Sequence, residues 1–239
     1  MATKKRKKQR KPRVKSLSSA ARTRPDSTNL TYSEYEITDE PMENWNLKRL
    51  PAEVRDTIDD LYEQVYQSPK DVLPELECRV VTYPEVPLFA NHLTIAYGRA
   101  GKTEKAEALV VETYQRHPQY LFAKVNYAQI CLSKGEVSKV PGIFNHKFDI
   151  KALYPRRKRF HIDEFVGFTG VMFNYHFAIG QTNTALHYYH MLRQVAPSHP
   201  LTKQAKRSLY PPFWLRWLLK LAGKKRLQSI GRTEWRNFT

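Results

Sequence analysis

The chain has 239 residues, long enough for one or two domains with a buried core, and its formal net charge is +17 at pH 7. Its two cysteines are too few for a disulfide framework or a cysteine-rich zinc site, and no apolar stretch of about 18 residues is present to cross a bilayer. The basic N-terminus is not followed by the apolar stretch of a secretory signal. We therefore expect a cytoplasmic protein, or a nuclear one if the source is eukaryotic.

The positive charge is concentrated at the two ends of the chain. From Met1 to Arg24 there are eleven Lys or Arg residues and no acid, and from Lys203 to Thr239 there are ten against a single Glu. The part between these ends has 19 basic and 22 acidic residues. Polycationic ends attract phosphate backbones, anionic lipid or acidic proteins, and such binding weakens steeply with salt.

Residues 1–45 have the composition of a disordered basic tail. The run from Lys4 to Lys15 is followed by Ser, Thr, Asn and acids, which bury too little apolar surface to offset the entropy of ordering. Three interpretations of the run stay open: a nuclear localisation signal, an arm for nucleic acid or the ribosome, or a solubilising tail. It lacks interleaved aromatics, so contact with nucleic acid is expected at the backbone. The cations expected to meet phosphate or an acidic partner are Lys4, Lys5, Arg6, Lys7 and Lys8.

Helical periodicity begins near Leu50 and predicts a helical domain over residues 46–207. Few alternating β-branched runs occur, so an all-α fold is expected. Both Cys78 and Cys131 lie inside apolar-periodic stretches, which predicts that they are small core residues. The first apolar-periodic stretch of the domain contains Val54, Ile58, Leu61, Tyr62 and Val65.

An internal repeat runs through this domain. Gly101 and Gly135 are 34 residues apart, as are Pro84 and Pro118. A second set of four positions is also repeated, and two unrelated helical segments would rarely agree at so many. The residues Gly101, Ala106, Val110 and Pro118 recur with the same offsets as Gly180, Ala185, Tyr189 and Pro197.

Each repeated residue has a physical role in a helix-turn-helix unit. The glycine at the end of the first helix is free to take the left-handed conformation, and the alanine allows the helices to cross closely. Thr103 and Thr182, two residues after their glycines, are expected to cap the second helix. Pro118 and Pro197 are expected to end it.

The period and these residues resemble the tetratricopeptide repeat (TPR) family. The resemblance covers roughly 150 residues and implies an α-solenoid of about four repeats, whose first helices line a concave groove. Gly135 and Gly180 are 45 residues apart, which predicts an insertion near 149–161. The repeats are placed at 53–86, 87–120, 121–154 and 166–199.

The resemblance places a set of mostly polar residues in the groove. Amide side chains suit an extended peptide because each offers a donor and an acceptor to a backbone. The alternative is that these residues are solvated helix faces. The groove positions carried over are Asn91, Ile95, Arg99, Asn126, Gln129, Ser133 and Asn174.

Two further segments stand out. The insertion carries Arg156, Arg157, Lys158 and Arg159, which form either a contact for phosphate or an acidic partner, or a solvated loop. In the Trp-rich basic segment 208–239, a predicted helix with Trp214 and Trp217 either caps the last repeat or lies in a membrane interface.

Catalysis finds little support in the sequence. No phosphate loop, nucleophile motif or paired carboxylates occur in a matching context, and the histidines do not predict a metal site. We expect a non-enzymatic scaffold or adaptor without cofactor or metal that binds a peptide or helix of another protein. The alternatives are an RNA- or ribosome-associated protein that uses its basic tails, and a peripheral membrane adaptor.

Overall fold

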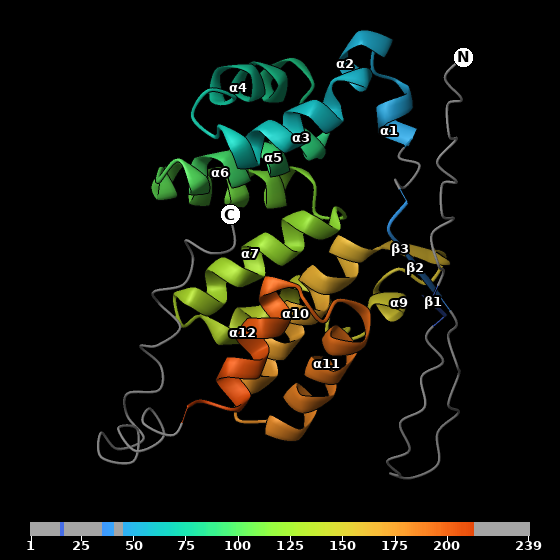
Figure 1. Cartoon of the computed structure of the whole chain (residues 1–239), viewed down its shortest axis with the longest axis vertical. Coiled ribbons are helices and arrows are strands. Elements are labelled where there is room, and N and C mark those ends of the chain that lie inside the picture. The colour runs from blue at the N-terminus through green and yellow to red at the C-terminus, as the bar shows by residue number, and fades with distance from the viewer. Residues whose placement is uncertain (1–14, 17–34, 41–44, 213–239) are drawn as a thin grey trace, which may run out of the picture.

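The computed structural model describes residues 15–16, 35–40 and 45–212. Within these ranges the chain is mostly helical, as the sequence predicted, and three short strands lie beside the helices (Figure 1). The predictions for Lys4–Lys8 and for Trp214 and Trp217 lie outside the described residues. The helices are α1 (Trp45–Lys48), α2 (Ala52–Asp56), α3 (Ile58–Gln67), α4 (Leu73–Thr82), α5 (Pro87–Arg99), α6 (Thr103–Arg116), α7 (Leu121–Ser133), α8 (Val140–Ile143), α9 (Ile150–Leu153), α10 (Ile162–Ala178), α11 (Thr182–Val195) and α12 (Pro200–Leu209).

The helices pack in sequence order along the molecule. Helix α5 contacts α3, α4 and α6, while α7 joins this group to α10, which packs against α11 and α12 (Figure 1). Leu76 and Ala96 lie fully buried in the cluster between α3 and α6, and Phe144, Phe165 and Leu192 in the larger cluster around α7, α10 and α11. Burial of these apolar side chains is the main term that holds short helices together.

Three glycine turns share one local structure. Gly101, Gly135 and Gly180 have φ angles of 77°, 77° and 79°, so the predicted left-handed conformation is confirmed. In each turn the amide of the next residue donates at 2.8 Å to the carbonyl oxygen of the residue four before the glycine. This bond satisfies a helix-terminal carbonyl that would otherwise lack a partner.

The predicted threonine caps are wrong. Thr103 and Thr182 are the first residues of α6 and α11, and no side-chain bond caps either helix. The glycine turn explains the difference, because the residue just after each glycine closes the first helix and also starts the second. Pro118 and Pro197 follow the ends of α6 and α11, as predicted.

The two cysteines have different environments. Cys131 is buried on α7, as predicted, with 1% of its surface exposed. The same prediction is wrong for Cys78, which is exposed on α4. The core side of α4 is set by Leu73 and Leu76, and Cys78 lies off that stripe.

The partner of α7 is broken into short pieces. A 3-10 turn (Val137–Lys139), α8 and α9 replace a long second helix, and Asn145 and His146 turn the chain with φ angles of 52° and 57°. Lys124 on α7 is 4% exposed, and its Nζ donates at 2.8 Å to the carbonyl of Ile143 at the end of α8. Burial lowers the pKa of this ammonium.

Part of the predicted disordered tail is ordered, so that prediction is wrong for these residues. Strands β1 (Lys15–Ser16), β2 (Glu36–Thr38) and β3 (Arg159–His161) form a sheet in the order β1-β2-β3. Strand β2 pairs in parallel with β3, with Ile37 opposite Phe160. The short alternation of polar and apolar residues at 36–38 is too brief to reveal a strand whose paired residues lie 123 positions later.

Helix α12 packs against α10 and α11. Ala205 and Thr202 are 2% and 3% exposed, and Leu201 approaches Gly170 of α10 so closely that an added Cβ would lie 3.0 Å from its side chain. Helix α12 therefore closes off part of α10 and α11 from solvent. Among the described residues, none of the helices has the length and apolar character needed to span a membrane.

The glycine turns yield a stability prediction. No atom lies within 4 Å of a Cβ added at Gly135, so Gly135→Ala adds only backbone strain, and we expect a loss of about 1 to 2 kcal/mol in urea denaturation. Gly142→Ala in α8 is the matched control, since it meets no atom within 4 Å and its φ is not positive. Equal stability losses in the two variants would contradict the strain argument.

Candidate functional site

Four predicted groove residues form pairs between neighbouring helices. The Nδ2 of Asn126 on α7 donates to Oδ1 of Asn91 on α5 at 2.9 Å. The Nδ2 of Asn174 on α10 donates to Oε1 of Gln129 on α7 at 3.3 Å. The amides therefore bridge α5, α7 and α10 along one side of the molecule. We call this side, together with the adjoining side of α3, the first-helix face.

Each amide pair has polar atoms for which the described residues supply no partner. The first pair uses one donor and one acceptor, so one NH₂ group and one carbonyl oxygen of Asn91 and Asn126 make no other side-chain bond within the described part of the chain. Likewise, one NH₂ group and one carbonyl oxygen of Gln129 and Asn174 make no other side-chain bond within the described part of the chain. Each pair therefore presents one donor group and one acceptor, the same set that a peptide unit presents.

The other three predicted groove residues are bound within the chain. The Nη2 of Arg99 donates to the backbone oxygen of Tyr66 at 3.0 Å, and its guanidinium lies 4.9 Å from the centre of that ring. Ser133 donates from Oγ to the carbonyl of Ile130. Ile95 is partly buried and packs against the core of the first helices.

Two tyrosines on α3 belong to this face and were missed by the sequence analysis. Tyr62 and Tyr66 are 38% and 43% exposed, although Tyr62 belongs to the apolar periodicity that predicted this helix. Their hydroxyl oxygens lie 3.2 Å apart, and their rings meet edge to face with centres 5.2 Å apart. Burial is the first cause that raises the pKa of Tyr62, so its hydroxyl stays protonated and remains a donor at neutral pH. The sequence signal for this pair is two aromatic residues four positions apart, because such residues lie on the same face of a helix.

A buried histidine lies beneath these tyrosines. His92 on α5 is 4% exposed, and its ring centre lies 5.1 Å from that of Tyr62. Its Nδ1 is buried and has no hydrogen-bond partner among the residues that the structure describes. Burial lowers the pKa of His92 to about 4, because desolvation penalises the charged imidazolium.

Two of the four cations of the basic loop make ion pairs within the described part of the chain. Arg157 makes a bidentate bond with Glu164 at 3.0 and 2.6 Å and lies 4.4 Å from the centre of the Phe160 ring. Arg159 makes ion pairs of 3.1 Å with Glu36 and with Glu40. These two predicted phosphate contacts are thus engaged with carboxylates, whereas Arg156 and Lys158 are exposed.

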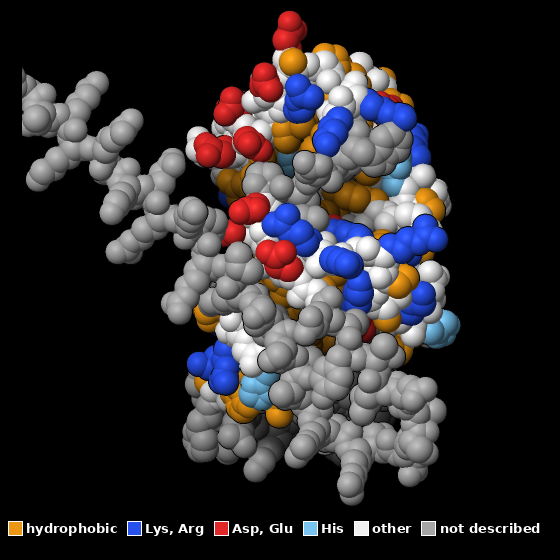
Figure 2. Space-filling view, turned by 90° about the vertical axis from the view of Figure 1, so that its right-hand side faces the viewer, with side chains coloured by type: hydrophobic (Ala, Val, Ile, Leu, Met, Phe, Trp, Pro, Cys, Tyr) orange, Lys and Arg blue, Asp and Glu red, His pale blue; other side chains and the backbone are white. Residues whose placement is uncertain are grey.

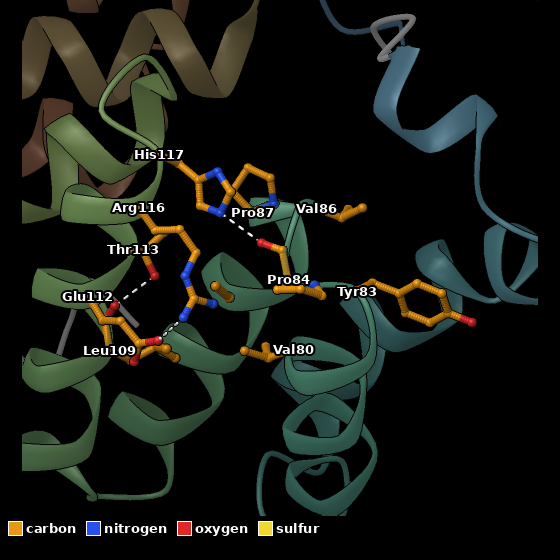
Figure 3. Close-up of a pocket in the computed structure, with 11 residues that line it drawn as sticks. Val80, Tyr83, Pro84, Val86, Pro87, Leu109, Glu112, Thr113, Arg116 and His117 are labelled. Carbon is orange, nitrogen blue, oxygen red and sulfur yellow. Dashed lines mark hydrogen bonds and ion pairs between the residues drawn. The ribbon is translucent and has the colours of Figure 1, made fainter.

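The cavity in Figure 3 is small and lies away from the first-helix face. Residues of α4, α5 and α6 and of the connections that follow α4 and α6 line it. Its volume of about 10 Å³ fits roughly one water molecule, far below the pockets that bind metabolites. Arg116 pairs with Glu112 at 2.9 Å, and His117 Nε2 lies 2.8 Å from the carbonyl oxygen of Pro84 (Figure 3).

The described residues contain no group of three or more His, Cys, Asp or Glu placed to hold a metal ion. Comparisons of the chain with protein-family models, with curated proteins and with solved structures find no match. The geometry of the chain itself is therefore the ground for a functional proposal.

His92 gives the face a pH-dependent stability. The folded-state pKa of His92 lies below the ordinary value of 6.5, so below pH 6.5 the unfolded chain takes up a proton that the folded chain does not. The stability that the neutral His92 contributes is therefore fully present above pH 6.5 and is lost as pH falls toward 4. We expect His92→Phe to remove roughly 3 kcal/mol of the acid-induced loss of unfolding free energy that the wild-type chain shows between these pH values. Urea denaturation of both chains across the range measures it.

His190→Phe, at an exposed position on α11, is the control and should retain the wild-type pH dependence of stability. A His92→Phe chain that loses stability with acid as steeply as the wild type would contradict the assignment.

Proposed function

We propose that the chain is a TPR-like helical-repeat interaction protein, without catalytic activity, that holds a peptide or helix of a partner protein on the first-helix face. The observation that carries the proposal is the pairing of Asn91 with Asn126 and of Gln129 with Asn174. Residues chosen from a repeat resemblance alone lie next to one another across three helices. An interaction groove requires that arrangement.

The repeated glycine turns support the repeat assignment. The same backbone conformation and the same 2.8 Å bond occur at Gly101, Gly135 and Gly180, at separations of one period and of one period plus an insertion. A helix pair of this kind cannot bury its apolar side alone, so stacked pairs are the expected result. Stacking places the first helices side by side and presents their polar residues to a ligand.

The chemistry of the face favours a partner that brings both polar backbone groups and apolar side chains. Each amide pair offers a donor and an acceptor, and Tyr62 and Tyr66 offer exposed rings and hydroxyl groups. Tyrosines contribute large contact areas at protein interfaces and lose little conformational entropy on binding. The face is therefore suited to protein recognition more than to a small charged metabolite.

The proposal is tested by capture from a lysate of the source organism, with nuclease and high salt present to remove partners held by the basic tails. Full-length Asn126→Ala/Asn174→Ala removes the donor of each amide pair. We expect at least one protein to be retained by the wild type and reduced about tenfold or more by the variant, because two hydrogen-bonding groups are lost.

Asn183→Ala/Gln194→Ala is the matched control, since it removes two exposed amides from α11, away from the face. It should retain the partner at the wild-type level, and circular dichroism should show that all three chains melt alike. If both double variants lose the same partners, or if nuclease and salt remove every partner, recognition by the face is ruled out.

A further inference from the structure

Helices α3 and α12 lie toward opposite ends of the helical body and bury the same pattern of positions (Figure 1). The core-facing residues are Ile58, Leu61 and Val65 of α3, and Thr202, Ala205 and the partly buried Leu209 of α12. A helix that buries only the first, fourth and eighth positions of such a pattern packs through one side. The opposite side of each helix therefore faces solvent.

The solvent-facing sides of these two helices carry opposite charge. The charged and exposed side chains are Asp59, Asp60 and Glu63 on α3, and Lys203, Lys206 and Arg207 on α12. We call these sets the acidic side of α3 and the basic side of α12. Each set contains two charges that are four positions apart, and such residues lie one turn apart on the same side of a helix. The two sides therefore match in both sign and spacing.

The charges of these two sides make no ion pair within the described part of the chain. Several exposed charges on the helices between them do pair with neighbours. Arg116 pairs with Glu112 at 2.9 Å, and Lys134 pairs with Glu107 at 2.6 Å. The described residues therefore leave the acidic side of α3 and the basic side of α12 available to another molecule.

The difference in charge extends over both ends of the helical body. Residues 52–85, which contain α2, α3 and α4, have nine acids and three Lys or Arg, whereas residues 182–212, which contain α11 and α12, have four Lys or Arg and no acid. Most of the Asp and Glu side chains visible in Figure 2 lie in the upper half of the molecule, the end at which α2, α3 and α4 lie in Figure 1. The helical body therefore has a negative end and a positive end.

We propose that the acidic side of α3 in one copy of this chain binds the basic side of α12 in a second copy, so that the chain self-associates head to tail. The contact joins two different surfaces. A dimer therefore keeps one acidic side and one basic side unoccupied, and further copies add at its ends. The proposal does not rest on the function proposed for the first-helix face, because the amide pairs of that face take no part in the contact.

A second copy is favoured as the partner because the chain itself supplies both matching surfaces. The net charge of +17 opposes association at long range. Salt at about 0.1 M screens charges that are more than about 10 Å apart, whereas the opposed side chains meet at contact distance. Tyr210, which directly follows α12, is 59% exposed and adds an aromatic ring beside the cations. Exposed ion pairs are individually weak, so the association is expected to be reversible and to need several pairs at once.

Sedimentation velocity of the purified full-length chain tests the contact. At about 50 mM salt the weight-average sedimentation coefficient should rise with protein concentration, and at about 500 mM salt the rise should disappear, because charges are then screened within about 4 Å. Asp59→Lys/Glu63→Lys and Lys203→Glu/Arg207→Glu should each weaken self-association about tenfold or more, because like charges then oppose one another. An equimolar mixture of the two variants should associate within about threefold of the wild type, because opposite charges meet again between them.

Glu104→Lys/Glu112→Lys is the matched control, since it reverses two exposed acids on α6 and changes the net charge as much as the α3 variant does. It should self-associate like the wild type, and circular dichroism should show that all chains remain folded.

Three results would overturn the proposal. The first is a sedimentation coefficient that does not change with concentration at low salt. The second is an equal loss of association in the α3 variant and its control, which indicates net charge alone. The third is a mixture of the α3 and α12 variants that associates no better than either variant by itself. That result indicates that the acidic side of α3 meets cations other than those of α12.

Discussion

The left-handed glycine turn is the constraint on which the arrangement of the helices depends. At Gly101, Gly135 and Gly180 the chain reverses with one conformation and one closing bond, so each following helix leaves its predecessor at a set angle. Burial of apolar side chains then holds neighbouring helices together, in one cluster around α5 and another around α7, α10 and α11. The side-by-side placement of α5, α7 and α10 follows, and with it the contact between amides that are 35 and 45 residues apart.

The long helix expected after α7 is replaced by short elements, and other groups complete the packing there. The turn around Pro141 leaves α7 without a long partner, and Lys124 reaches across to the carbonyl of Ile143. The insertion then returns as β3, and its Phe160 is fully buried against Tyr35 from the N-terminal segment. Tyr35, which precedes the first helix in the sequence, thus packs against a strand that lies between α9 and α10.

Features that depend on local chemistry were predictable from the sequence, and features that depend on distant partners were not. The glycine turns, the helix ends before Pro118 and Pro197, and the amide positions follow from spacing and residue type. The pairing of β2 with β3 was not predictable because residues 36–38 are only three residues with one apolar side chain, and the partner strand is distant in the sequence. Likewise, periodicity could not separate the exposed Tyr62 from the buried Leu61, since both fit an apolar stripe on α3.

Helix α10 connects the basic loop to the first-helix face. Glu164 caps this helix by accepting from the amide of His161 at 3.0 Å, and the same carboxylate holds Arg157 of the basic loop. Further along α10, Asn174 contributes to the first-helix face. The ion pair of Arg157 with Glu164 therefore fixes the basic loop to the start of the helix that carries Asn174.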